Sequence, residues 1–328
     1  MRDPRDPLGE QVEIVVASGK GGVGKSTIAA VLAVELYRSG YRLVAADADA
    51  EAPNLHLALG VDKWDSVEPY YEGRVAFIRR DICTNCGICA EVCPFGAVEV
   101  RNGNYVINEW ICEGCLTCSF ACPVKAIRYR FKVKAGEIKV AGTRYGFTLV
   151  SGESMPGRPN SGKLVTEVKN RAKSLLGRSG VLLVDAAAGI GCQVISSLTG
   201  AHIAVLVAEP TPASFSDLKR IHKLTKHFML APMLVINKFD LNERFTKVIE
   251  EYAEENNIPV VAHIPYDENV PKALNMGRPL HEAFPGSSAA KGVLEVVSYI
   301  KKEVLPNWRR WWSTYKPKKP EIYVPIIK

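Results

Sequence analysis

Eight of the nine cysteines in this 328-residue chain fall into two copies of one spacing pattern. Each copy reads C-x2-C-x2-C-x3-C-P, and all four cysteines recur at one constant offset along the chain. Runs of this kind supply thiolate ligands to 4Fe–4S clusters. The repeat therefore predicts two such clusters within one short stretch. The two copies comprise Cys83, Cys86, Cys89, Cys93 and Cys112, Cys115, Cys118, Cys122.

The repeat resembles that of two-cluster bacterial ferredoxins, in which the fourth cysteine of each run binds the other cluster. The resemblance implies a first cluster on Cys83, Cys86, Cys89 and Cys122. It implies a second cluster on Cys112, Cys115, Cys118 and Cys93. Two alternatives stay open. One is structural zinc, which favours separate cysteine pairs, and the other is clusters that only stabilise the fold.

A glycine-rich loop lies upstream of the cysteines, between a β-branched apolar run at 12–17 and a helical stretch at 27–38. It satisfies G-x-x-x-x-G-K-[ST], a loop whose backbone N–H groups cradle phosphates. We expect Lys25 to reach the β- and γ-phosphates of ATP and Ser26 to bind Mg²⁺. The predicted nucleotide-binding residues of the loop are Gly19, Lys20, Gly21, Gly22, Val23, Gly24, Lys25, Ser26 and Thr27.

Lys20, directly after the first glycine, makes the loop the variant GKGGVGK[ST]. With this loop the chain resembles the MinD/ParA/nitrogenase-iron-protein family of P-loop ATPases. The resemblance implies Mg²⁺-dependent ATP hydrolysis and an ATP-dependent homodimer in which Lys20 reaches the partner's nucleotide. It also implies that Asp49 activates the attacking water and that Asp47 supports the Mg²⁺ site. Asp185, after the strand at 181–185, is then the Walker-B-like acid that holds Mg²⁺ through water.

Other residues of the predicted ATPase domain lie in loops after its later strands. In relatives the loops after 203–208 and 233–236 contact adenine, which points to Pro210 and Asn237. Asn237 belongs to an N-K-x-D pattern that also reads guanine in GTPases, so guanine stays open. His56 is either a partner-contacting switch residue or a structural histidine. The Ala186–Ala188 run stands where close relatives have prolines, which leaves the position of switch II open.

Strands that alternate with helical stretches predict an α/β fold with a doubly wound parallel sheet. The chain between Asp49 and Asp185 is far longer than an ordinary loop, and it holds the cysteine repeat. Over roughly 12–300 the chain resembles MinD-superfamily ATPases that contain an inserted α+β ferredoxin-like domain. The predicted parts are an ATPase domain at 1–77 and 161–300, the inserted domain at 78–132, a hairpin and linker at 133–160, and a tail at 301–328.

Two features lie outside these assignments. Cys192 has the same offset from Asp185 as a cluster-ligating cysteine of the nitrogenase iron protein, so it is either an extra cluster ligand or a small buried hydrophobe. The tail carries eight Lys or Arg, two Glu and several tryptophans. We expect these tryptophans to pack on the body, with a terminal strand after them. The alternatives for the tail are a protein partner, an anionic membrane or nucleic acid.

The composition, with 47% hydrophobic and 23% charged residues and a net charge of +7, is typical of soluble globular proteins. No membrane-spanning run or signal peptide is recognised, so a cytoplasmic protein with reduced cysteines is expected. The motifs together predict an ATPase that couples dimer switching to electron transfer, as an ATP-gated reductase, or to metallocluster delivery to a client protein. The alternative is a MinD/ParA-like spatial regulator whose clusters are structural or redox-sensing.

Overall fold

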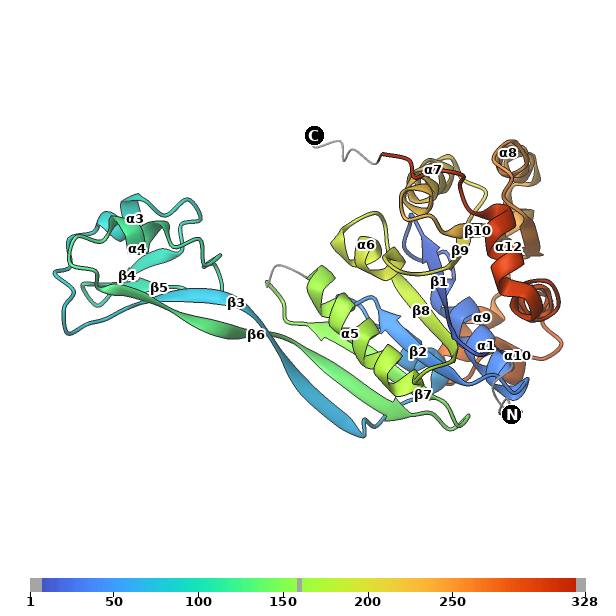
Figure 1. Ribbon diagram of the computed structural model, residues 1–328, viewed down its shortest axis with the longest axis horizontal. Helices are drawn as coiled ribbons and strands as arrows, with labels where there is room; N and C mark the ends of the chain where they lie inside the picture. Colours follow the sequence, from blue (N-terminus) through green and yellow to red (C-terminus); the bar gives the residue numbers. More distant parts are fainter. Residues whose placement is uncertain (1–7, 158–160, 323–328) are drawn as a thin grey trace. The chain divides into compact units, whose positions relative to one another are not determined.

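The computed structural model describes residues 8–157 and 161–322, and its chain divides into two compact units (Figure 1). The larger unit takes its residues from Met1–Val67, Ile138–Glu153 and Ser161–Lys328. The smaller unit takes its residues from Glu68–Glu137 and Ser154–Asn160. The inserted domain expected at 78–132 lies inside the smaller unit, whose bounds are wider.

The larger unit is built on a twisted sheet whose strand order, within the described residues, is β11-β10-β9-β1-β8-β2-β7-β6-β3. From β11 to β7 all neighbouring strands are parallel, which confirms the predicted α/β fold with a parallel sheet. These strands are β1 (Gln11–Ser18), β2 (Leu43–Ala48), β7 (Thr148–Ser154), β8 (Gly180–Ala188), β9 (Ile203–Ala208), β10 (Ala231–Asn237) and β11 (Val260–Ile264). The last two strands of the order, β6 (Ile127–Gly142) and β3 (Ser66–Ile78), belong in part to each unit.

Helices cover both faces of this sheet (Figure 1). On one face, Ile14 and Val16 of β1 share a hydrophobic core with the first helix and the C-terminal helices. Val15 and Ala17 are also fully buried and point to the opposite face, as the two-residue period of a strand requires. The first face carries α1 (Lys25–Arg38), α2 (Leu55–Leu59), α9 (Asn269–Asn275), α10 (Leu280–Ala283), α11 (Ser288–Tyr299) and α12 (Trp308–Tyr315). The other helices of the unit are α5 (Ser161–Leu176), α6 (Cys192–Leu198), α7 (Pro212–His227) and α8 (Glu243–Glu255).

The structure adds to the sequence-based expectation at two segments of the sheet, the 133–160 stretch and Ala186–Ala188. The 133–160 stretch is more than a hairpin and linker, because β7 pairs in parallel with β2 and buries Leu149 and Val150 completely. The alanines at Ala186–Ala188 continue β8 to its end. Alanine keeps the N–H group that a proline lacks, so it can continue the hydrogen bonding of the strand. Gly189 N then donates to Ser18 O at 3.0 Å and holds switch II against the end of β1.

The C-terminal tail packs on the body, as expected for its aromatic residues. Trp308 and Trp311 of α12 are buried, and the Trp308 ring meets His202 edge-on at 4.9 Å. Trp312 Nε1 donates to Met229 O at 3.3 Å. The predicted terminal strand falls mostly on 323–328, outside the described residues. Among the helices that the structure describes, none is long and apolar enough to cross a membrane.

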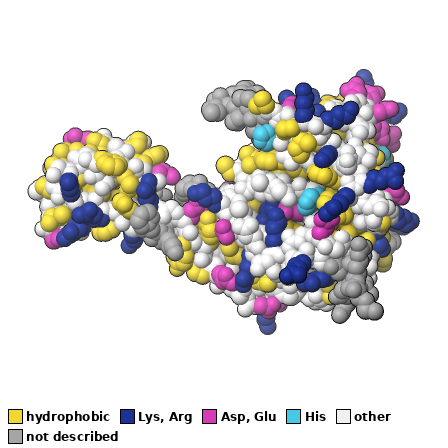
Figure 2. All heavy atoms as spheres, in the orientation of Figure 1, with side chains coloured by type: hydrophobic (Ala, Val, Ile, Leu, Met, Phe, Trp, Pro, Cys, Tyr) yellow, Lys and Arg dark blue, Asp and Glu magenta, His cyan; other side chains and the backbone are white. Residues whose placement is uncertain are grey.

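The smaller unit has little apolar core of its own. A two-stranded antiparallel sheet of β4 (Val98–Arg101) and β5 (Asn104–Ile107) accompanies two short helices, α3 (Ile88–Glu91) and α4 (Thr117–Ala121). Its buried cluster consists of Ala76, Cys118 and Ile127, and three of the partly buried residues around it are also cysteines. Hydrophobic side chains gather on the surface of this unit (Figure 2). The buried core described for this unit is therefore small and consists partly of cysteines.

One buried histidine of the larger unit predicts how stability depends on pH. His222 in α7 is 2% exposed and shares a 2.7 Å hydrogen bond with Tyr252 of α8. Burial, with a smaller contribution from the Lys226 charge, lowers the pKa of His222 to about 3. His222 therefore becomes protonated below about pH 6.5 in the unfolded chain, whereas in the folded chain it stays neutral until the pH approaches 3. Stability is expected to fall as the pH drops below 6.5, by about 3 kcal/mol at pH 4 from this group alone.

Urea unfolding followed by tryptophan fluorescence between pH 7 and pH 4 measures this loss. His222→Gln should be less stable at pH 7 but lose less stability on acidification, because the titrating group is gone. His227→Gln is the matched control, since His227 lies on the same helix and is exposed. An equal pH slope in the wild-type and His222→Gln proteins would contradict the assignment.

Candidate functional site

The P-loop runs from the end of β1 to the start of α1 and is held by close contacts at two of its glycines. Gly24 precedes α1 with a φ of 97°, a left-handed conformation that favours glycine. A Cβ on Gly24 would lie 2.6 Å from Nδ2 of Asn237, and one on Gly19 would lie 2.4 Å from Cβ of Asp217. Side chains at these positions would push the loop off its supports. Lys25 is the buried first residue of α1.

Two predicted carboxylates meet because of strand register. Asp47 of β2 lies directly opposite Asp185 of β8, and both are almost completely buried. Asp47 Oδ1 accepts from Asp49 N at 3.2 Å, and its Oδ2 accepts from Leu55 N at 2.9 Å. Asp49 Oδ1 in turn accepts from Ala52 N at 3.2 Å. Through these hydrogen bonds Asp47 fixes the turn that carries Asp49.

The electrostatics of this pair fit a bound cation. Burial raises the pKa of Asp47 well above its usual range, and the Asp185 charge adds to this. Burial also raises the pKa of Asp185 to about 6, although Ser26 and Lys25 pull it down. Asp185 Oδ1 is buried and has no hydrogen-bond partner among the residues that the structure describes. Carboxylate and hydroxyl oxygens are ligands that Mg²⁺ accepts, directly or through water. Ser26 and Asp185 would hold it.

The structure brings Lys20 and Lys238 to one carboxylate, Glu209, to which the sequence analysis assigned no role. Glu209 Oε1 lies 2.5 Å from Lys238 Nζ, and its Oε2 lies 3.7 Å from Lys20 Nζ. Ser18 Oγ also donates to Lys20 O at 2.6 Å. Glu209 is mostly buried, directly before the buried Pro210, whereas the Lys20 side chain is 44% exposed. The lysine expected to act on a partner's nucleotide thus lies against a carboxylate of its own chain.

Asn237 lies beside the P-loop. Its Nδ2 donates to Val23 O at 2.8 Å, and its Oδ1 accepts from Lys238 N at 3.0 Å. Asn237 therefore braces the loop, and its role in base recognition stays a prediction. A second link was missed from sequence: Gln193 Oε1 accepts from Ala50 N at 2.9 Å. This buried bond joins the residue after Asp49 to the start of α6.

Two residues with open assignments are placed by their surroundings. The His56 ring packs on Trp64, with 5.7 Å between centroids, and burial lowers the pKa of this half-buried histidine. Both observations favour the structural role. Cys192 begins α6 and is exposed, so it is not the small buried hydrophobe of one interpretation. Its backbone passes close to α5, since a Cβ on Gly162 would lie 2.9 Å from Cys192 O.

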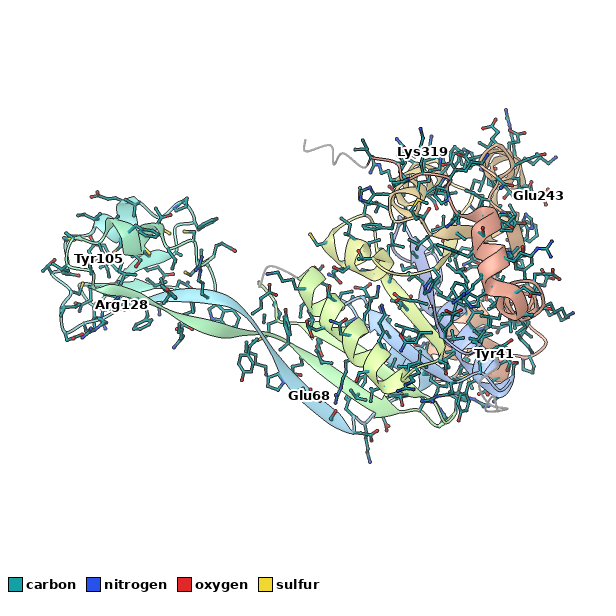
Figure 3. All side chains as sticks on the ribbon, in the orientation of Figure 1. Tyr41, Glu68, Tyr105, Arg128, Glu243 and Lys319 are labelled. Atoms are coloured by element: carbon teal, nitrogen blue, oxygen red, sulfur yellow. The ribbon has the colours of Figure 1, made fainter. Side chains whose placement is uncertain are left out.

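The eight clustered cysteines line two separate cavities of the smaller unit. Each cavity has an empty volume of about 330 Å³, its solvent-open part included. Tyr105, labelled in Figure 3, lines the first cavity beside its cysteines. The cysteines of the first cavity are Cys83, Cys86, Cys89 and Cys122. Those of the second are Cys93, Cys112, Cys115 and Cys118. These sets coincide with the crossed sets implied by the ferredoxin resemblance, while ligation itself stays a prediction.

The backbone around the cavities repeats together with the sequence. Ala97 N donates to Cys93 Sγ at 3.3 Å, and Ala126 N donates to Cys122 Sγ at 3.2 Å. Left-handed residues also recur in matching places of the two copies. They are Asn85 and Gly114, Gly87 and Leu116, and Gly96 and Lys125. Leucine and lysine adopt this conformation at a cost, so the surrounding structure enforces one backbone path in both copies.

The cysteines of the second cavity influence one another electrostatically. Burial raises the pKa of the Cys118 thiol to about 11, and the charges of Cys112, Cys115 and Cys93 add to this. Within residues 8–157 and 161–322, no group of three or more His, Cys, Asp or Glu side chains is arranged to hold a metal ion.

Comparison with known proteins identifies the family. The CobQ/CobB/MinD/ParA nucleotide binding domain matches residues 14–280. This chain belongs to that family. Its membership agrees with the parallel sheet, the P-loop and the buried carboxylates, and it confirms the MinD/ParA resemblance found from the motifs. ATP and Mg²⁺ are consistent with this family.

Individual members of the CobQ/CobB/MinD/ParA family resemble the chain over most of its length. An uncharacterized protein of Methanocaldococcus jannaschii is 35% identical over 271 residues, which cover 82% of this chain and 90% of that protein. The antiactivator FleN of Pseudomonas aeruginosa is 27% identical over 304 residues, 89% of this chain and 87% of FleN. The septum site-determining protein MinD of Pyrococcus horikoshii, complexed with Mg-ADP, has a TM-score of 0.55 at 20% identity and covers 89% of this chain and 96% of that chain. The last similarity concerns the fold alone.

Proposed function

We propose that this chain is an ATP-hydrolysing iron–sulfur protein in which the nucleotide cycle controls electron transfer through two 4Fe–4S clusters. The observation that carries the proposal is that four cysteines line each of two matching cavities in the smaller unit. Family membership supports the nucleotide half. In the chain, residues 68–137 lie between Asp49 and Asp185, so the smaller unit is covalently joined to both switch regions.

Four cysteines line each cavity, which is the number of thiolate ligands that a 4Fe–4S cluster takes. The backbone N–H bonds to Cys93 and Cys122 would stabilise thiolates rather than thiols. The small core of the unit supports metal-dependent folding. When bound, each cluster supplies reversible one-electron chemistry.

In the nucleotide half, the residues of this chain bind and orient ATP. Lys25 would pair with the β- and γ-phosphates, and Ser26 and Asp185 would hold Mg²⁺. Asp49 would orient the attacking water from the turn fixed by Asp47. Lys20, once released from Glu209, would reach the nucleotide of a second copy, so hydrolysis requires a homodimer. Gln193 gives Asp49 and α6 a direct connection through Ala50.

A variant of the proposal makes the protein a carrier that assembles or delivers a metallocluster to a client protein. The exposed Cys192 supports this variant, because an accessible thiolate can take part in ligand exchange. In that case iron leaves the protein in the presence of an apo-acceptor. A dependence of this transfer on Cys192 would separate the carrier from the electron-transfer protein.

The second candidate is a spatial regulator, and the named relatives favour it. FleN, which is 27% identical, is an antiactivator, and a putative septum site-determining protein MinD of Mesostigma viride is 27% identical over 271 residues. In this reading the clusters are structural or redox-sensing, and the exposed Arg310, Lys318 and Lys319 of the tail contact a partner, a membrane or nucleic acid.

Anaerobic reconstitution with ferrous iron and sulfide tests the proposal. We expect about eight iron and eight sulfide per chain, and reduction potentials that differ between the MgATP-bound and MgADP-bound protein. Cys118→Ser should keep ATP hydrolysis while it loses one cluster and slows electron release to a viologen dye. Equal reduction potentials in the MgATP-bound and MgADP-bound protein would contradict the coupling of the nucleotide cycle to electron transfer. A protein that takes up no iron would contradict the cluster assignment.

The regulator is tested on the same preparation. It predicts binding to anionic vesicles or duplex DNA that is lost when Arg310, Lys318 and Lys319 are replaced by glutamine. Substitution is preferable to truncation at 301, because Trp308 and Trp311 belong to the core of the larger unit. Binding that persists after cluster removal would favour the regulator over both cluster-centred functions.

A further inference from the structure

A side-chain hydrogen bond to a cysteine sulfur is found in the second cavity. Thr117 Oγ1 lies 3.4 Å from Cys115 Sγ, in the second cavity. The corresponding residue of the first copy is Ile88, two residues after Cys86, and it has no hydroxyl group. A thiolate that binds iron has no proton to donate, so the threonine hydroxyl must be the donor.

This difference does not come from a different backbone. Ile88 begins α3 after the left-handed Gly87, with a φ of 85°. Thr117 begins α4 after the left-handed Leu116, with a φ of 68°. The two side chains therefore leave the same place in the repeat, and only their chemistry differs.

Two backbone hydrogen bonds to sulfur occur at matching places of the repeat. The N–H bonds of Ala97 and Ala126 to Cys93 and Cys122 are almost equal in length. Since Cys93 lines the second cavity and Cys122 the first, each cavity has one of them. The Thr117 hydroxyl adds a side-chain hydrogen bond, on Cys115, to this matched pair.

A cation reinforces the same asymmetry. Arg74 Nε donates to Gly114 O at 2.9 Å, directly before Cys115, and its guanidinium lies 5.7 Å from the Tyr129 ring centroid. In the first copy Asn85 takes the place of Gly114, and its Nδ2 donates to Gly103 O at 2.7 Å. The positive charge of Arg74 thus lies beside Cys115 of the second cavity.

We propose that Thr117, assisted by Arg74, gives the cluster of the second cavity the higher reduction potential. Reduction adds one negative charge to a cluster, and a hydrogen bond to a ligand sulfur or a nearby cation stabilises that charge. An electron shared by the two clusters therefore rests in the second cavity, near Cys115. The inference rests on the proposed function, because it requires both clusters to be present.

The test is a dithionite titration of the full-length, reconstituted protein with redox mediators, followed by electron paramagnetic resonance. The wild-type protein should show two separate potentials. Thr117→Val should lower the higher one, enough to change the ratio of reduced second to reduced first cluster about tenfold, as expected for a hydrogen bond to a charged group. Thr117→Ser should keep the wild-type value. Ile88→Thr should raise the lower potential and bring the two together.

Ser119→Ala is the matched control, because this hydroxyl of the same helix donates to Ile127 O at 2.9 Å and not to a sulfur. Iron and sulfide content is measured for every variant. Thr117→Val with full iron and both potentials unchanged would overturn the proposal. If that variant loses its cluster, Ile88→Thr decides, and unchanged potentials there would overturn it equally. A wild-type chain that binds no cluster would instead refute the proposed function.

Discussion

Replacing Lys25 with alanine is expected to lower the rate of ATP hydrolysis by roughly a thousandfold or more. Lys25 is the buried first residue of α1, and its charge acts on both Asp49 and Asp185. No other residue of the loop can place a cation at the γ-phosphate from inside the fold. Phosphate release at saturating MgATP, with protein folding checked by circular dichroism, measures the loss. Hydrolysis within tenfold of the wild-type rate would contradict the assignment.

Lys20 provides the matched comparison, because it is predicted to act on the partner's nucleotide. Lys20→Ala should bind ATP normally but hydrolyse it slowly. Asp49→Asn should also be inactive, since it lacks its own water-orienting carboxylate. An equal mixture of the two should recover about a quarter of the wild-type rate, because half of the dimers pair an intact Asp49 with an intact Lys20 at one site. A mixture no more active than its components would refute action between subunits.

The second large effect concerns the cysteines, where paired substitutions distinguish crossed from uncrossed ligation. Cys83 and Cys122 line the first cavity although they belong to different motifs, whereas Cys112 lines the second cavity. If ligation is crossed, Cys83→Ser/Cys122→Ser removes one cluster and leaves about four iron per chain. Cys112→Ser/Cys122→Ser removes both clusters. Iron and sulfide analysis after anaerobic reconstitution measures the result.

The opposite pattern, with both clusters lost in Cys83→Ser/Cys122→Ser and one kept in Cys112→Ser/Cys122→Ser, would establish uncrossed ligation. The single variants control for loss of folding. Protease digestion adds a second measure: loss of both clusters should expose the smaller unit to cleavage, because its core consists largely of cysteines. Cys192→Ser, outside both cavities, should change neither iron content nor digestion.

The other strands of the parallel sheet could be predicted from local sequence, since each is a short apolar run. The β7 strand was not predicted. It sits at the end of a long insertion and contains Gly152, so its pairing with β2 follows only from the assembled sheet. Asp47 and Asp185 were assigned from the family resemblance, and the structure places them opposite each other on the neighbouring strands β2 and β8.

The contacts that the motifs did not disclose join residues far apart in the chain. Glu209 meets Lys20 and Lys238, and Gln193 meets Ala50, across loops whose approach depends on how helices pack on the sheet. No local sequence pattern identifies such partners, because the residues around Glu209 or Gln193 carry no information about which distant residue will lie next to them. The Glu-Pro-Thr-Pro segment placed Glu209 after a strand but did not indicate which cations it would bind.

By itself the sequence determined the family, the P-loop and the two cysteine runs, because these depend on residue types at short, regular spacing. Only the tertiary structure decided which cysteines share a cavity in this chain, that Ala186–Ala188 continue β8, and that Lys20 lies against Glu209. It also showed that Thr117 and Ile88 line matching places of the two cavities, and that the Thr117 hydroxyl lies within hydrogen-bond distance of Cys115 Sγ. These features depend on the distance between side chains, and that distance is set when separate segments pack together.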